Sequence, residues 1–332
     1  MSKLWRIHLF AGYKDEAKKL EARTYCIKNK IMAIGWSCKI MHDSIQEYKE
    51  KFKEHNPTWM KKNGNYPDSV NRIIEQVQEG DYVWTYDGIE HYWIGKVIDK
   101  YPHIPVYHDN DIFFKEFGVY REVENWYSCE DDEVPGKVIN SFIKGSTLQP
   151  IKTLLEYSEY LYQKKHKNQP NLPFHPNEDV FETIKNLLHY NDLEDLLGLW
   201  LQIDRNYVVF PSTNKQSTKD YEYILKKEDG SKKAIIQCKT GYDCINLETF
   251  DKYKDKYEIY LSVIDGHLRR NKKEVNINDE NIININDYNT EYPEKSGYQI
   301  YKVSLKYLLD WAKKNKNILP DRIRYYLDIT GY

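Results

Sequence analysis

One stretch of the chain constrains its fold more than any other, because it has the pattern of two strands joined by a short charged turn. The first strand contains Asp220, the turn spans residues 226–233, and the second strand ends in Gln237-Cys238-Lys239. A β-hairpin with this layout brings a carboxylate, an amide and an ammonium group together at one end. The alternative is an edge hairpin whose Asp and Lys residues only solvate a turn.

These groups suit a site for a divalent metal ion. The oxygens of Asp220 and Gln237 are hard ligands of the kind that Mg²⁺ or Mn²⁺ takes, and the main-chain carbonyl of Cys238 is a further ligand candidate. Strand alternation points the Cys238 side chain away from the metal, into the core. Lys239 can orient a water molecule and neutralise charge that builds on a phosphate. The pattern therefore predicts a metal-dependent phosphodiesterase.

The hairpin resembles the PD-(D/E)xK nuclease superfamily, in the variant where Gln replaces the second acid. The resemblance covers roughly residues 176–265, in which an amphipathic helix precedes the hairpin and a further helix and strand follow it. It implies a restriction-endonuclease-like α/β/α fold. It also implies that Glu182 of the upstream helix, with Glu178 as second choice, contributes to the site. The chain departs from the family pattern because no Pro precedes Asp220 and because Gln237 makes the metal site one charge poorer.

The N-terminal part carries a second signature. A helix leads into Gly-Asp (80–81) and an apolar strand, and the next strand contains Gly-x-Val (95–97). An earlier strand ends in Ile-Gly-Trp (34–36). This order resembles the EVE and YTH-like branch of the PUA fold over most of residues 3–150. The resemblance implies a PUA-like β-barrel with helices that binds nucleic acid and holds one extruded base, often a modified one, in an aromatic pocket.

Aromatic side chains on these strands are the candidates for the base pocket, since stacking on them is worth roughly 1–3 kcal/mol per base. The candidates are Trp36, Trp84, Tyr86 and Trp93. The alternative for each is core packing, which is the usual role of aromatic residues in strands. Trp36 is the candidate that core packing explains least readily, because it ends a strand directly after a glycine.

Length and composition limit the remaining possibilities. A chain of 332 residues can form two domains with separate cores. It has no apolar run of membrane-spanning length and no signal-peptide pattern, so a cytoplasmic protein without a membrane segment is expected. Five cysteines without a CxxC pair argue against a disulfide framework or a structural zinc site. Without a GxxxxGK[ST] motif, no nucleoside triphosphate is expected as a cofactor.

The net charge of −2 gives no sign of nucleic-acid binding by bulk electrostatics. Positive charge is gathered instead in short clusters that can contact phosphates or form solvated faces. These clusters are residues 164–167, 226–227, 232–233, 269–273 and 313–314.

The sequence thus predicts a two-domain chain of the α+β and α/β classes. Residues 1–150 are the expected PUA-superfamily recognition domain, residues 151–176 a helix and Pro-containing linker, and residues 177–332 the nuclease domain. The predicted function is a modification-dependent endonuclease, which recognises a modified cytosine in double-stranded DNA by base flipping. A homodimer is expected, because one centre cuts one strand at a time. Two alternatives stay open: a non-catalytic reader of modified nucleic acid, and an RNA-directed YTH-like binding protein.

Overall fold

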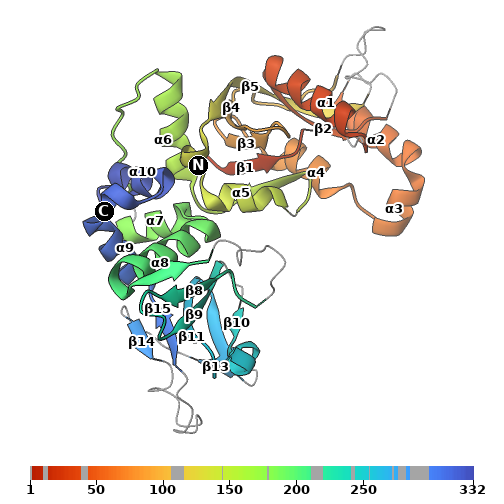
Figure 1. Ribbon diagram of the computed structural model, residues 1–332. Helices are drawn as coiled ribbons and strands as arrows, with labels where there is room; N and C mark the ends of the chain where they lie inside the picture. Colours follow the sequence, from red (N-terminus) through yellow and green to blue (C-terminus); the bar gives the residue numbers. More distant parts are fainter. Residues whose placement is uncertain are drawn as a thin grey trace. The chain divides into compact units, whose positions relative to one another are not determined.

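Figure 1 shows the computed structural model, a mixed α+β protein. The chain forms two compact units, unit 1 (Met1–Asn177) and unit 2 (Glu178–Tyr332). The structure describes residues 2–9, 14–38, 44–105, 116–143, 145–177, 179–210, 220–240, 244–253, 255–270, 273–275, 282–284 and 299–332.

Unit 1 is built on a curled six-stranded sheet that forms a half-barrel. Its neighbouring strands pair antiparallel, except for the parallel pair of the first and third strands in the chain. In spatial order the strands are β2 (Ile31–Trp36), β5 (Phe117–Cys129), β4 (Tyr92–Val97), β3 (Tyr82–Tyr86), β1 (Leu4–Ile7) and β6 (Leu148–Ile151).

Helices of unit 1 connect and cover these strands. They are α1 (Glu16–Lys28), α2 (Ile45–His55), α3 (Pro57–Asn63), α4 (Asp68–Asn71) with the π-helical turn η1 (Arg72–Gln76), the 3₁₀ turn η2 (Asp131–Glu133), α5 (Gly136–Ile143) and α6 (Leu155–His166). The helix expected before Gly-Asp (80–81) is present as α4 and η1, and the two strands expected after it are β3 and β4, which pair antiparallel.

The Gly-x-Val motif has a packing role in β4. A Cβ atom on Gly95 would lie 2.6 Å from Cγ1 of Val123 and 2.9 Å from the ring of Trp126 on the neighbouring β5. The register between β4 and β5 also shifts between Gly95 and Val97. Only glycine allows the two strands to approach so closely at this irregularity, which sharpens the curl of the sheet.

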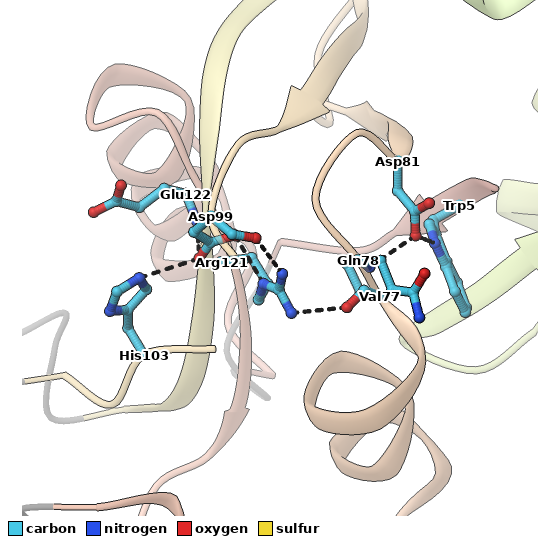
Figure 2. Close-up of polar contacts among 8 residues, drawn as sticks. All are labelled: Trp5, Val77, Gln78, Asp81, Asp99, His103, Arg121 and Glu122. Carbon is cyan, nitrogen blue, oxygen red and sulfur yellow. Dashed lines mark hydrogen bonds and ion pairs between the residues drawn. The ribbon is translucent and has the colours of Figure 1, made fainter. Parts of the chain in front are cut away.

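The Gly-Asp motif has a hydrogen-bonding role, which Figure 2 shows in part. The buried carboxylate of Asp81 accepts the indole N–H of Trp5 (2.7 Å) and the main-chain N–H groups of Lys3 (2.8 Å) and Gln78 (2.9 Å). It thereby ties the turn before β3 to the start of β1. Each of these bonds satisfies a donor that burial would otherwise leave unpaired.

A second buried carboxylate joins β5 to the segment after β4. Arg121 donates from Nε to the side chain of Asp99 (2.8 Å) and from Nη2 to its carbonyl (2.6 Å), and from Nη1 to the carbonyl of Val77 (2.8 Å). Asp99 also accepts the main-chain N–H of Glu122 (2.9 Å) and lies 3.2 Å from Nε2 of His103 (Figure 2). This network fixes the curl of unit 1 where β5 leaves β4.

The helix expected in the linker belongs to unit 1. α6 contacts β3, β4 and β5, and Trp84 donates from its indole N–H to Ser158 of this helix (2.9 Å). Beyond α6 the chain folds back, because Phe174 is buried against Tyr157 and Tyr160 with ring centroids 5.8 and 4.8 Å away. Part of the Pro-containing segment is therefore packed onto unit 1.

Unit 2 contains a mixed six-stranded sheet and a small three-stranded sheet. In spatial order the larger sheet consists of β14 (Ile282–Asn284), β15 (Ile300–Val303), β11 (Glu258–Ile264), β9 (Lys233–Thr240), β8 (Ile224–Lys227) and β7 (Tyr207–Val209). The smaller sheet consists of β10 (Cys244–Asn246), β12 (His267–Arg270) and β13 (Lys273–Val275). In the larger sheet β9, β11 and β15 run parallel, whereas β7, β8 and β9 form an antiparallel meander.

Helices cover both faces of the larger sheet. They are α7 (Val180–Leu187), α8 (Tyr190–Arg205), the 3₁₀ helix η4 (Leu247–Tyr253), α9 (Leu305–Lys314), the 3₁₀ turn η6 (Lys316–Ile318) and α10 (Asp321–Thr330). Trp200 of α8 packs edge-on against Tyr260 of β11 on one face. Phe250 of η4 joins Ile235 and Ile259 in the core of the other face.

Candidate active site

The predicted hairpin is present as β8 and β9, but its first strand begins at Ile224 and so does not contain Asp220. The register of this hairpin decides which acid meets Gln237. Ile224 pairs with Ile235, so in an antiparallel ladder Glu222 falls opposite Gln237. The main-chain N–H of Glu222 donates to the carbonyl of Ile236 (2.9 Å), so the two segments stay bonded beyond β8 with the register shifted by one residue. The amide Nε2 of Gln237 donates to the carboxylate of Glu222 and to the carbonyl of Cys238 (3.2 Å).

A second carboxylate reaches this place from α8. Glu194 lies one turn before Gly198 and two turns before Leu201, both buried, so helical spacing puts it at the face that packs on the sheet. Burial, followed by repulsion from Glu222 and Asp195, raises the pKa of Glu194 to about 8, although Lys239 acts against the shift. Burial likewise raises the pKa of Glu222, with Lys239 and the bond from Gln237 opposing it. Glu194, Glu222 and Lys239 therefore form one electrostatically coupled group.

A close contact between α8 and the residue directly before β8 positions the carboxylates of Glu194 and Glu222. The hydroxyl of Tyr223, next to Glu222, donates to the main-chain carbonyl of Glu194 (3.0 Å). It reaches this carbonyl because residue 198 is a glycine: a Cβ atom there would lie 1.9 Å from the hydroxyl oxygen of Tyr223. The glycine in mid-helix, which costs helix stability, is thus explained by this contact.

The acid predicted in the first strand lies elsewhere. Asp220 precedes β8, and its carboxylate accepts from Nζ of Lys252 and from the hydroxyl of Tyr253 (3.1 Å) in η4. The acid bonded to Gln237 is Glu222, two residues further on. Gln237, Cys238 and Lys239 are at the end of β9 as expected, with the Cys238 side chain buried.

The helix acid expected at the site, Glu182, pairs with a lysine of its own helix. Glu182 lies on α7, where it pairs with Lys185 (2.5 Å), and the same lysine pairs with Asp265 after β11 (3.0 Å). Glu182 thus takes part in tying α7 to the turn after β11. The acid brought to Glu222 and Lys239 is Glu194 of α8. Glu178 lies outside the described residues.

The donor set of this site fits a hard divalent cation. Within the part of the chain that the structure describes, no group of three or more His, Cys, Asp and Glu side chains is arranged as a metal site. The centre has instead two carboxylates of raised pKa, Glu194 and Glu222, with the amide of Gln237 and the carbonyl of Cys238 beside them. Two carboxylates that repel one another in a partly buried place are stabilised by a cation between them.

The base-pocket candidates separate into core and partly buried residues. Trp84 is fully buried and bonded to Ser158, so it belongs to the core of unit 1 and its face is not open to a base. Trp93 is half-buried and donates to Asp87 (3.3 Å). Tyr86 donates to the carbonyl of Ile89 (2.9 Å), with its ring against Tyr92.

Trp36 has the most distinctive surroundings of the four candidates. It ends β2 in the left-handed region (φ 71°), which is unusual for a bulky residue. Its half-buried ring meets Trp59 of α3 edge-on at 4.9 Å and Phe52 of α2 at 5.8 Å, and its carbonyl accepts the hydroxyl of Tyr48 (3.0 Å). Trp59, which precedes Met60 in the short helix α3, was not among the sequence candidates.

The first of the lysine-rich clusters is engaged within unit 1. Lys164 and Lys165 both pair with Glu133 (3.1 and 2.7 Å), and His166 contacts the hydroxyl of Tyr127 (3.0 Å). These three residues therefore hold α6 against η2 and β5 of unit 1.

Comparisons with known proteins bear on unit 1. A protein-family model described as a domain of unknown function (DUF8426) matches residues 10–149, which lie within unit 1. No curated protein and no solved structure gave a match to the chain. Among the helices that the structure describes, none is long and apolar enough to cross a membrane. The functions of both units therefore have to be argued from their own residues.

Proposed function

We propose that the chain is a modification-dependent DNA endonuclease whose unit 2 is a Mg²⁺-dependent nuclease of the restriction-endonuclease-like fold. The observation that carries this proposal is the convergence of Glu194, Glu222, Gln237 and Lys239 at the carboxyl end of β9. The chain order supports it, because the helix α7 precedes the hairpin of β8 and β9, and η4 and the strand β11 follow it, as the resemblance implies.

Each side chain has a role that its position supports. Glu222 and Glu194, with the carbonyl of Cys238 and the oxygen of Gln237, would hold Mg²⁺. The ion would lower the pKa of bound water and stabilise charge on the phosphate. Lys239, which interacts with both carboxylates, would orient the attacking water and neutralise the phosphate oxygens. The Nε2 group of Gln237 holds Glu222 in place. If the side-chain amide of Gln237 were flipped by half a turn, its oxygen would face the metal position instead.

Unit 1 would read the modified base. Its curled sheet with flanking helices suits a PUA-like domain, and its Gly-Asp and Gly-x-Val motifs build that sheet. Trp36 is the strongest pocket candidate, since its ring is half-buried and Trp59 stands beside it. A modified cytosine in duplex DNA is the proposed ligand, flipped out to be inspected.

The test is cleavage of matched duplexes with Mg²⁺. The duplexes carry cytosine, 5-methylcytosine, 5-hydroxymethylcytosine or its glucosylated form, and single-stranded modified RNA serves as competitor. We expect cleavage of at least one modified duplex, loss of cleavage in Glu222→Gln and Lys239→Ala, and cleavage by the control variant Asp220→Ala. Modified-base binding without cleavage under any divalent ion would favour a non-catalytic reader, and preferential binding of RNA would favour the RNA-directed alternative.

Metal binding can be tested without cleavage. Mg²⁺ should raise the melting temperature of the wild-type chain and of Asp220→Ala by mass action. It should raise that of Glu222→Gln much less. Equal stabilisation of Glu222→Gln and wild type would remove Glu222 from the metal site.

A further inference from the structure

Unit 2 contains a cleft that the proposed centre does not use. It has a volume of about 680 Å³, within the range of ligand-binding pockets. The start of α7, the end of β11 with the turn after it, and the junction of β15 and α9 form its walls, and Figure 1 shows these elements in unit 2. Its lining combines two aromatic rings (Phe181, Tyr332), three ammonium groups (Lys185, Lys302, Lys306) and two carboxylates (Asp179, Asp265). Asp179 caps α7, and Asp265 pairs with Lys185.

The cleft lies at the same edge of the sheet as the centre. β9, β11 and β15 run parallel, so their carboxyl ends meet at one edge. Val263, which lines the cleft, pairs with Lys239 of the centre, and Lys302 pairs with Leu261 of the same strand β11. Neighbouring strands are about 5 Å apart. A ligand that lay along this edge would therefore pass from Lys239 directly into the cleft.

The three lysines of the cleft come from two places in unit 2. Lys185 is held between Asp265 (3.0 Å) and Glu182 (2.5 Å), which anchors α7 to the turn after β11. Lys302 and Lys306 stand on either side of Ser304, at the end of β15 and in the first turn of α9. Ser304 caps this helix by accepting the N–H of Tyr307 (3.1 Å). Both lysines thus project from a rigid junction at the cleft.

We infer that this cleft binds the sugar–phosphate backbone of the nucleic-acid strand next to the phosphodiester that is cut. Lys302 and Lys306 contact phosphates, and Phe181 offers an apolar wall to the adjoining nucleotide. The inference rests on the proposed nuclease function, because that function places a phosphodiester at Lys239. A nucleic-acid strand suits the site better than a free nucleotide, since the cleft is an extension of the edge at which the centre lies.

The experiment measures affinity for an unmodified fluorescent DNA duplex, so that base reading contributes least. The full chain carries Lys239→Ala throughout, which prevents cleavage. Lys302→Glu, Lys306→Glu and the milder Lys306→Gln are compared with Lys314→Glu. Lys314 is an exposed residue in the last turn of the same helix α9, and its cluster, residues 313–314, does not line the cleft. Anisotropy titrations over a range of salt concentrations give the dissociation constant and its salt dependence, and circular dichroism confirms folding.

Each cleft variant should bind several-fold more weakly than Lys314→Glu. Its log–log salt slope should fall by about 0.9 for each phosphate that the variant no longer neutralises. Affinities and slopes equal to those of Lys314→Glu in all three cleft variants would overturn the inference, whether or not the wild-type chain cleaves DNA. Weaker binding by the cleft variants, in a chain that cuts no DNA with any divalent ion, would uphold the cleft as a nucleic-acid site and reject only the nuclease function.

Discussion

The contact between Gly198 and the hydroxyl of Tyr223 makes a prediction that needs no knowledge of the substrate. In Gly198→Ala the new methyl group would lie 1.9 Å from the hydroxyl oxygen and 3.0 Å from Cζ of the ring. The ring must move, and its hydrogen bond to the carbonyl of Glu194 (3.0 Å) is broken. Removing the hydroxyl first, by Tyr223→Phe, takes away the severe part of the clash.

The magnitudes follow from three contributions. Overpacking costs about 1–3 kcal/mol, the broken hydrogen bond costs about 1 kcal/mol, and alanine in mid-helix gains about 1 kcal/mol over glycine. Gly198→Ala alone should therefore destabilise unit 2 by about 1–3 kcal/mol. In the Tyr223→Phe background the same substitution should be close to neutral, because the helix gain offsets the remaining 3.0 Å contact.

The assay is a double-mutant cycle on the full chain. Urea unfolding is monitored by hydrogen exchange of the α8 amides, which reports on unit 2 specifically. We expect a coupling of about 1–3 kcal/mol between the two positions. An equal effect of Gly198→Ala in both backgrounds would refute the reasoning, since the contact would then not decide the residue at 198. Mg²⁺ stabilisation should also weaken in Gly198→Ala, because the contact sets Glu194 beside Glu222.

Three further predictions concern function. Glu222→Gln should lower the cleavage rate by about 100-fold or more, whereas Asp220→Ala should keep most of the wild-type rate. A single-turnover assay in which Asp220→Ala loses cleavage and Glu222→Gln keeps it would restore Asp220 as the metal ligand. Trp36→Ala should weaken binding of modified duplex by about 1–3 kcal/mol, while Trp84→Phe should lower stability without changing the preference for modified over unmodified DNA. A folded Trp36→Ala chain that keeps the full preference for modified DNA would exclude Trp36 from the base pocket. If two copies each cut one strand, mixing wild type with Glu222→Gln should accumulate nicked duplex. A monomeric mass on DNA by light scattering, with double-strand breaks unaffected by the Glu222→Gln chains, would exclude a dimer.

The sequence predicts elements better than it predicts which residues meet. The hairpin around residues 226–233 follows from local signals, namely alternating apolar residues and a turn with glycine, and it is confirmed by the pairing of β8 with β9. The choice between Asp220 and Glu222 depends on how far the pairing extends past β8. Both residues have the same parity along the chain, so strand alternation cannot distinguish them. The bonds of Asp220 to Lys252 and Tyr253 arise from tertiary structure.

The helix acid shows the same limit from another direction. Glu182 and Glu194 both lie on amphipathic helices upstream of the hairpin. The family resemblance favours Glu182, because its helix matches the family's short and degenerate pattern better. A signal for Glu194 is present, because helical spacing sets it in line with Gly198 and Leu201 on the apolar face of α8. An acid on a buried helix face needs a partner, and a glycine one turn later indicates that another chain segment approaches closely.

In unit 1 the motifs are informative about the fold and less so about the pocket. Asp81 and Gly95 are explained by the bonds and the close approach that they permit inside the sheet. Trp84 is a base-pocket candidate by sequence because strand aromatics serve both core and ligand, and only its burial against α6 distinguishes the two roles. These motifs account for the curl of the sheet, and the residues that bind must be found from exposure.

The raised pKa of Glu194 leads to a last prediction, on stability and pH. Its carboxyl group ordinarily titrates near 4.5, and burial with repulsion from Glu222 raises its pKa to about 8 in the folded chain. Between these two values the folded chain keeps a proton that the unfolded chain has released, so its free energy of unfolding falls as the pH rises through this interval. Glu194→Gln should remove that part of the fall, and urea unfolding read at the α8 amides from about pH 5 to pH 8 measures it. Mg²⁺ should counteract the fall in the wild-type chain, because the cation replaces the proton between the two carboxylates. An unchanged pH dependence in Glu194→Gln would show that burial and Glu222 do not raise the pKa of Glu194 in the folded chain.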